Sequence, residues 1–303
     1  MNGQSNQGGV KRATCMYLLS AIVVLSSGIS AFGFTTQSQL SYGGFTTPNV
    51  IYTDLVETST TDSFFRDDGN GGVVQLGNYG EPILTGDLLN FNAPHFSAQV
   101  FPGPDLDLTD GFLSFRLFSQ PGKFVEAMRL EEFGSVSLTS PRGPNPLTLA
   151  NVEAPLFLTI YEVLLDDGTP DGLVYELPST ITISGTMSVA PDRGPDGWNA
   201  QDHPDVSTWQ GALLLNIPDA LAAVDPTLGG GLPILGATQL DYRQNNLMTA
   251  LAVDNVSASF IDKKGIIIEP IVTNVVPEPT GTTLVLLLVS MLGFRMGSRR
   301  RRQ

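Results

Sequence analysis

The side chains in this sequence that could support catalysis are two histidines and many carboxylates. His95 lies in an alternating segment, Pro94–Phe101, and His203 lies in Asp-His-Pro-Asp, where the flanking carboxylates favour its protonated form. A catalytic serine needs a tight turn, a histidine and an orienting carboxylate, and the sequence has no Gly-x-Ser-x-Gly motif. We therefore interpret His95 as a sheet residue and His203 as a solvated loop residue, with a metal site at His203 as the alternative.

Two acidic, glycine-rich segments, 67–72 and 166–172, have the composition of calcium-binding loops. An EF-hand loop needs oxygen ligands at positions 1, 3 and 5 and glycine at position 6. Positions 3 and 5, counted from the first aspartate of either segment, are glycine or proline, so neither segment fits. We expect two hairpin turns and no cofactor. Calcium bound between separate loops stays open as an alternative, with candidate ligands Asp67, Asp68, Asp166, Asp167 and Asp171.

Trp198, in Asp-Gly-Trp-Asn, is the best candidate for an aromatic ring that stacks on a sugar. We nevertheless interpret it as a loop tryptophan that packs onto the edge of a sheet, with sugar stacking as the alternative. A glycosidase needs two carboxylates across a cleft, but 30 acidic residues make some such pair inevitable, so their number discriminates nothing. The sequence shows no phosphate loop, zinc signature or dinucleotide motif. We therefore predict no catalytic residues and no enzymatic activity.

The charge of the chain is strongly asymmetric. Between the two termini, residues 34–274 carry nine basic and 29 acidic side chains, a net charge of −20. Such a surface repels nucleic acids and anionic lipids, which bind to basic surfaces. We therefore expect no nucleic-acid partner.

The N-terminus has the three parts of a secretory signal peptide. Lys11 and Arg12 form its basic part, residues 16–29 form its apolar part, and Ala31 and Gly33 offer small residues for cleavage. We predict cleavage after Gly33, with cleavage after Ala31 and an uncleaved anchor as alternatives. The single cysteine, at position 15, is removed with this segment, so the mature chain has no disulfide bond.

The C-terminus combines a proline-flanked carboxylate, an apolar run and a basic tail. Pro277-Glu278-Pro279 is extended because proline excludes helix there. Residues 280–298 are long enough for a helix of about 28 Å, which just spans a bilayer. The basic tail remains on the cytoplasmic side, and it ends in Arg299, Arg300, Arg301 and Arg302.

This arrangement closely resembles the PEP-CTERM sorting signal of exported bacterial proteins, over residues 277–302 and in all three parts. The resemblance implies that Pro277, Glu278 and Pro279 are recognised by exosortase, a membrane protease-transpeptidase. It also implies an inner-membrane precursor that is released to the cell surface or the exopolysaccharide matrix. Arg299 to Arg302 would act as the cytoplasmic stop-transfer segment.

Alternation of apolar and polar residues dominates the central region. The charged fraction is only 15%, and 32 glycines and 21 prolines supply turns. Alternating strands are predicted around residues 113–117, 180–189 and 209–217, and more fully buried strands over 156–165 and 265–272. The only predicted helix is Asp219–Val224, and the loop 191–206 shows no strand pattern.

These patterns predict an all-β ectodomain, an antiparallel β-sandwich of jelly-roll type. The predicted segments are a signal peptide at 1–33, the sandwich at 34–274, and the sorting signal with its transmembrane helix at 275–303. Two smaller sandwiches divided near residues 141–144 are the alternative. The leading functional hypothesis is an exported, non-enzymatic surface or matrix protein. An exopolysaccharide-binding module is second, and a secreted carbohydrate-active hydrolase is third.

Substitution Glu278→Ala, or deletion of residues 277–279, is expected to retain the protein in the inner membrane without unfolding the ectodomain. The reason is that this box lies beyond the last predicted strand and contributes no core area. Cell fractionation and the intact mass of released protein measure the effect. Normal release of both variants, or a released wild-type species that still carries Arg299–Arg302, would contradict the prediction.

Overall fold

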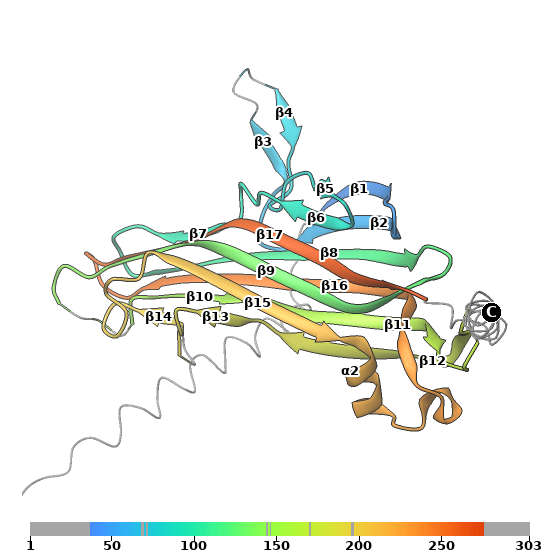
Figure 1. The fold of residues 1–303 in the computed structure, drawn as a ribbon. Helices are drawn as coiled ribbons and strands as arrows, with labels where there is room; N and C mark the ends of the chain where they lie inside the picture. Colours follow the sequence, from blue (N-terminus) through green and yellow to red (C-terminus); the bar gives the residue numbers. More distant parts are fainter. Residues whose placement is uncertain are drawn as a thin grey trace, which may run out of the picture.

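Antiparallel strands make up most of the chain that the structure describes (Figure 1). The structure, a computed structural model, describes residues 37–275 apart from positions 68, 69, 71, 144, 146, 170, 195 and 196. The predicted cleavage residues Ala31 and Gly33, the box Pro277–Pro279, the predicted span and the arginine tail lie outside the described residues. Within the described part, no helix is both long and apolar enough to cross a membrane.

The strands form two layers, which we name after their long strands β8 and β9. The β8 layer consists, in spatial order, of β1 (Ser38–Thr46), β2 (Val50–Ser59), β8 (Asp105–Ser119), β16 (Ile234–Ala252), β11 (Pro155–Leu165) and β12 (Leu173–Thr186). Two short strands continue it beside the second half of β16, namely β10 (Leu149–Glu153) and β14 (Trp198–Asn199).

The β9 layer is built around the pair β9 (Lys123–Thr139) and β17 (Ala258–Asn274). Its remaining strands are β5 (Ile83–Thr85), β6 (Leu88–Phe91), β7 (Ser97–Val100), β15 (Thr208–Asn216) and β13 (Ser188–Ala190). One backbone pair, Ala237 with Val125, joins β16 to β9, so that a single antiparallel sheet curls over on itself. A separate hairpin of β3 (Phe65–Asp67) and β4 (Val73–Gln75) stands away from both layers (Figure 1).

Period-two alternation in the sequence explains which side chains enter the core. In β8, Leu113, Phe115 and Leu117 are buried, whereas Ser114 and Arg116 point to the other face, as predicted. The predicted strand 180–189 alternates as expected, although position 187 interrupts the pairing and divides it into β12 and β13. The β character and the antiparallel arrangement are therefore confirmed.

The short helix α2 (Ile217–Val224) confirms the predicted helix but begins two residues earlier. Its N-cap is Asn216, whose side chain accepts a hydrogen bond from the backbone N–H of Asp219 at 2.9 Å. Pro218 is tolerated because the first turn of a helix leaves its N–H groups without intrahelical partners. A short 3-10 helix, η2 (Leu228–Gly231), follows α2 along the chain.

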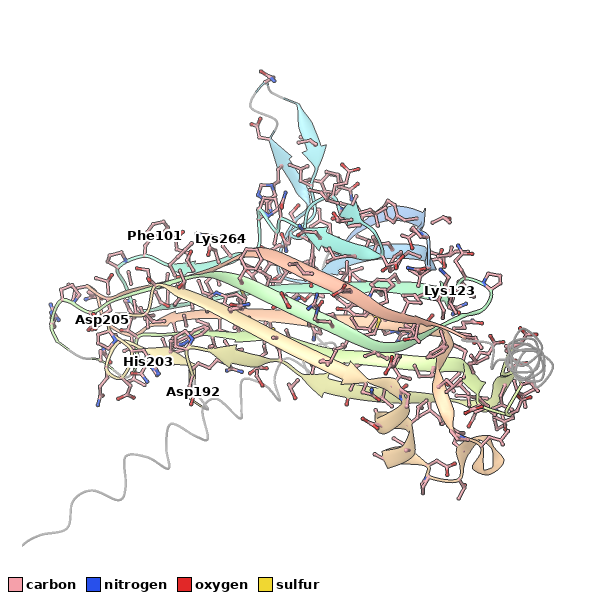
Figure 2. The ribbon with its side chains drawn as sticks, viewed as in Figure 1. Phe101, Lys123, Asp192, His203, Asp205 and Lys264 are labelled. Atoms are coloured by element: carbon pink, nitrogen blue, oxygen red, sulfur yellow. The ribbon has the colours of Figure 1, made fainter. Side chains whose placement is uncertain are left out.

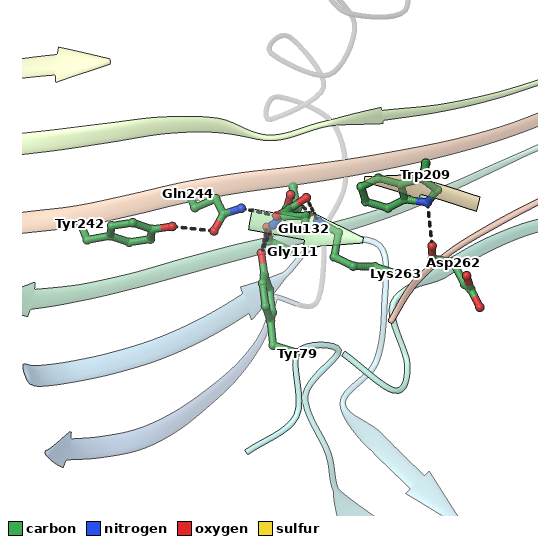
Figure 3. A network of polar contacts seen from close by, with 9 residues as sticks. Tyr79, Gly111, Glu132, Trp209, Tyr242, Gln244, Asp262 and Lys263 are labelled. Carbon is green, nitrogen blue, oxygen red and sulfur yellow. Dashed lines mark hydrogen bonds and ion pairs between the residues drawn. The ribbon is translucent and has the colours of Figure 1, made fainter. Parts of the chain in front are cut away.

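A buried polar cluster lies between the two layers (Figure 3). Lys263 of β17 forms an ion pair with Glu132 of β9, with 2.5 Å between Nζ and Oε2, and neither side chain is exposed. From the opposite layer, Gln244 of β16 donates to Glu132, and Asn246 accepts from Lys263 at 2.6 Å. Two buried charges are tolerated only when they are paired and further hydrogen-bonded, and each of these amides supplies one further bond to the pair.

Replacing a core side chain should cost far more than replacing an exposed one on the neighbouring strand. Leu130 of β9 is completely buried, whereas Leu214 of β15 is 64% exposed. Leu130→Ala is expected to lower the free energy of unfolding by about 2–5 kcal/mol, because it leaves a cavity between the layers. Leu214→Ala is the matched control and should change it by no more than about 0.5 kcal/mol. Chemical denaturation measures both, and equal effects would contradict the assignment of the core.

Candidate functional site

Trp198, the candidate for sugar stacking, is completely buried. Its indole N–H donates to the carbonyl of Pro191 at 3.1 Å, and its ring lies 6.2 Å from that of Trp209. The ring enters the interior because Trp198 belongs to the short strand β14, which pairs with Ala150 of β10. The sugar-stacking alternative is therefore wrong, and the ring packs against the sheet as we interpreted it. The prediction that the loop 191–206 contains no strand is wrong.

Neither histidine occupies a site built for catalysis. His95 lies in a turn before β7 and not within a strand, which corrects the sheet assignment. Burial, and then the charge of Arg66, lower the pKa of His95. His203 lies in a loop as predicted, at the same end of the molecule as Asp205 (Figure 2), and its Nδ1 accepts from the backbone N–H of Asn199 at 3.4 Å. Across the described residues, no three histidine, cysteine or acidic side chains gather as metal ligands would.

The acidic loops each join two paired antiparallel strands, as predicted for hairpins, and the candidate ligand Asp68 lies outside the described residues. Segment 67–72 joins β3 to β4, and segment 166–172 joins β11 to β12. In the second turn, Asp167 accepts from the backbone N–H and the hydroxyl of Thr169, at 2.9 and 2.6 Å, and these bonds lower its pKa. Asp166 accepts from the N–H of Gly168 at 3.0 Å. These carboxylates stabilise the turn, and calcium binding stays an untested alternative.

An array of polar side chains lies on the side of the β8 layer that faces away from the core. Five strands contribute one row across this face, in which backbone partners bring together Thr53, Arg116, Asp241, Thr159 and Thr182. A neighbouring row contains Ser114, Arg243, Phe157 and Ser184. Because the inner face of each strand is apolar, alternation places these side chains together on the outside. We call them the outer face.

A rigid ion pair lies in the middle of the outer face. Arg116 donates to both carboxylate oxygens of Asp241, from Nε at 2.7 Å and from Nη2 at 3.3 Å. The Tyr161 hydroxyl donates to the same carboxylate at 2.7 Å, and the guanidinium carbon lies 5.0 Å from the centre of the Tyr161 ring. Burial works in the opposite direction, but the hydrogen bonds from Arg116 and Tyr161 lower the pKa of Asp241. The three groups therefore form a charged, prearranged surface with donors and acceptors.

Strand β11 presents its polar and aromatic residues on this face, which sequence reasoning missed. Residues 156–165 were predicted to be more fully buried, yet Phe157 is 38% exposed and Thr159 is half-buried. The prediction was wrong for the first part of β11, where alternate positions leave the core, whereas Val163, Leu164 and Leu165 are buried as predicted. The order Leu-Phe-Leu-Thr-Ile-Tyr in residues 156–161 contains the alternation that would have identified it.

A buried carboxyl group on β2, Glu57, is the other titratable candidate. Its Oε1 accepts from the N–H groups of Asn78 and Tyr79, and its Oε2 accepts from the Tyr42 hydroxyl at 2.6 Å. A Cβ at Gly77 would lie 2.0 Å from Oε2, so only glycine fits there. Burial raises the pKa of Glu57 to about 7, against the lowering effect of these bonds and of the Arg66 charge. Because both oxygens are engaged, we interpret Glu57 as a structural group.

The raised pKa of Glu57 predicts a pH-dependent stability. The folded chain holds a proton that the unfolded chain releases above a pKa of 4.5. The free energy of unfolding should therefore fall by about 3 kcal/mol as the pH rises from about 4.5 to about 7, and then level off. Glu57→Gln keeps an acceptor for both backbone N–H groups and should remove this slope. Denaturation curves across that range measure it, and an identical slope in the variant would contradict the assignment.

Comparisons with known proteins show only distant likenesses. No protein-family model and no curated protein matches the chain. Among solved structures, the enzymatically active domain of bacteriophage CBA120 tailspike protein 4 is similar at 11% identity, covering 76% of this chain and 19% of that one, with a TM-score of 0.16. TmCBM61 in complex with β-1,4-galactotriose is similar at 7% identity, covering 60% and 81% of the two chains, with a TM-score of 0.16. A study of carbohydrate-binding modules of the β-sandwich superfamily supplies another, at 10% identity and 75% and 96% coverage, with a TM-score of 0.16. Similarities at this level identify no family, so the proposals below depend on the residues of this chain.

Proposed function

We propose that the chain is an exported, non-enzymatic protein of the cell surface or extracellular matrix that binds uncharged polysaccharide through the outer face. The observation that carries the binding role is the prearranged set Arg116, Asp241 and Tyr161 beside the exposed ring of Phe157. Planar carboxylate and guanidinium groups bind adjacent hydroxyls in pairs, and an aromatic ring covers the apolar C–H face of a sugar. The outer face combines both types of group.

The charge of the chain favours an uncharged polysaccharide over an acidic one. Residues 34–274 carry nine basic and 29 acidic side chains, so their negative net charge repels polyanions. Arg116 is already neutralised by Asp241, which leaves Arg243 as the exposed cation in the two rows described. Hydroxyl groups on Thr159 and Thr182, 3.1 Å apart, add donors and acceptors without charge.

The sandwich interpretation is also part of the proposal. Consecutive long strands alternate between the layers, since β8 leads into β9 and β16 leads into β17. Such alternation is typical of jelly-roll sandwiches, in which strands distant in sequence become neighbours. We propose that the curled sheet is a variant of this architecture, and that its role is to hold the outer face rigid.

Export and sorting complete the proposed function. Exosortase would recognise Pro277, Glu278 and Pro279 in an inner-membrane precursor and release the ectodomain toward the exopolysaccharide. Support comes from the sequence of both termini. An exported ectodomain must remain folded outside the cell, and the double layer would do so without a disulfide bond.

Binding of the full chain to immobilised uncharged polysaccharides and to a glycan array tests the proposal. Phe157→Ala and Asp241→Asn are expected to weaken binding at least about tenfold, because one removes the apolar platform and the other releases Arg116 and Tyr161. Leu214→Ala is the matched control, since Leu214 is an exposed apolar residue of the other layer, and it should bind as the wild type does. Unchanged binding in both outer-face variants would contradict the site. Release of new reducing ends from a bound polysaccharide would favour the hydrolase alternative.

A further inference from the structure

Three side chains of complementary reactivity meet in the interior, from three different strands. The Nζ of Lys263 lies 2.5 Å from Oε2 of Glu132 and 2.6 Å from Oδ1 of Asn246 (Figure 3). All three residues are completely or almost completely buried. Lysine is among the residues least often found buried, so an amine, an amide and a carboxyl group in mutual contact in a core call for a chemical explanation.

The surroundings of Lys263 make its uncharged, nucleophilic amine easier to form than that of a lysine in water. Nζ lies 4.9 Å from the centre of the Phe96 ring and 5.9 Å from that of Trp209. Burial lowers the pKa of Lys263 to about 8, although the negative charge of Glu132 works in the opposite direction. The carboxylate of Glu132, 2.5 Å from Nζ, is the nearest acceptor for the proton that the amine must lose. A desolvated lysine amine is an established type of nucleophile.

The side chain of Asn246 is held as the electrophile. Its Nδ2 donates to the Tyr79 hydroxyl at 2.7 Å, and that hydroxyl donates to the carbonyl of Gly111 at 2.9 Å. This chain of bonds fixes which way the amide points and directs Oδ1 toward Lys263. Since a C=O bond is about 1.2 Å long, Nζ is no more than about 4 Å from the amide carbon. Such proximity in a rigid site replaces an encounter in solution by a local rearrangement.

From this geometry we infer that the folded chain forms an isopeptide bond between Lys263 and Asn246, with Glu132 as the acid-base catalyst. Glu132 first accepts a proton from the ammonium of Lys263. The neutral amine attacks Cγ of Asn246, so that the Nζ–Cγ bond forms and the carbonyl electron pair moves to Oδ1. Glu132 gives its proton to Nδ2 and takes one of the two protons that remain on Nζ. The Cγ–Nδ2 bond then breaks as the carbonyl reforms, and the departing ammonia takes the proton from Glu132 and leaves as ammonium. Overall, an ammonium and a primary amide become a secondary amide and an ammonium ion, with no oxidant, reductant or cofactor.

The neighbouring residues position the catalyst and give the leaving group a path. Gln244 donates to the second oxygen of Glu132, and the Tyr242 hydroxyl donates to Gln244 at 2.7 Å, so the carboxyl group is held in place. A surface pocket of about 300 Å³ is lined by Lys263 together with Phe96 and Asp262. Because Lys263 contacts Asn246, ammonia formed at Asn246 would leave on this side of the cluster.

The bond would link β16 to β17 across the two layers. It would close a loop between Asn246 and Lys263 and restrict the unfolded chain as a disulfide bond of the same span does. Unlike a disulfide bond, it needs neither cysteine nor an oxidising environment. It would therefore cross-link an ectodomain whose predicted mature form contains no cysteine.

Peptide mapping of the purified full chain tests this inference. Trypsin cleaves after Arg243, Lys263 and Lys264 when these side chains are free. An isopeptide bond blocks cleavage after Lys263, so the fragment 244–264 should appear intact and one ammonia lighter than its sequence predicts. Fragmentation must place the lost ammonia between Asn246 and Lys263, which distinguishes the bond from cyclisation of the N-terminal Gln244 of this fragment.

Matched variants separate the chemistry from the fold. Lys264→Arg alters the exposed neighbour (Figure 2) and should retain the cross-link, whereas Lys263→Arg keeps the charge and should abolish it. Glu132→Gln should slow its formation by about 100-fold or more, because acid-base catalysis is lost. If Lys263→Arg fails to fold, the wild-type map still decides the matter. Complete wild-type cleavage after Lys263 would overturn the inference, as would cleavage after Lys263 that stays blocked in Asn246→Leu.

Discussion

The arrangement of the whole double layer depends on the ion pair between Lys263 and Glu132. Bringing two charges into an apolar core is costly, and the cost is offset only when attraction and hydrogen bonds are both complete. Here the completing groups come from the opposite layer, as Gln244 and Asn246 of β16. A layer shifted by one residue would leave a buried charge unpaired. The pair therefore fixes the alignment of the two layers. Apolar packing alone does not fix it, because apolar side chains of similar size are interchangeable.

The same register determines the outer face. Side chains alternate along each strand, so fixing Gln244 inside places Arg243 outside, and fixing Tyr242 inside places Asp241 outside. Asp241 then meets Arg116 of β8 as its direct backbone partner. A slip of one residue would exchange the core and the outer face on β16. The polar interior and the candidate binding surface are consequently two results of one constraint.

The sequence predicts local features of this chain well and long-range ones poorly. Alternation in β8, the turn at Asp166–Thr169 and the helix at α2 all follow from neighbouring residues, and the structure confirms them. The polar cluster was not predicted, because Glu132 and Lys263 are 131 positions apart and neither carries a local signal of burial. Trp198 was placed in a loop because its two-residue strand is too short to show a pattern.

A rigid interior also bears on what the outer face can do. Binding to a flexible surface loses affinity to the ordering of side chains and loops, whereas a prearranged surface avoids that loss. Arg116, Asp241 and Tyr161 are already engaged with one another, and each projects from a strand paired on both sides. Electrostatic repulsion among the acidic side chains opposes this order, since the net charge between the termini is −20. The buried pair acts against that repulsion at a place where both layers contribute. A covalent bond there would make the resistance independent of salt, because a bond, unlike a surface charge, is not screened.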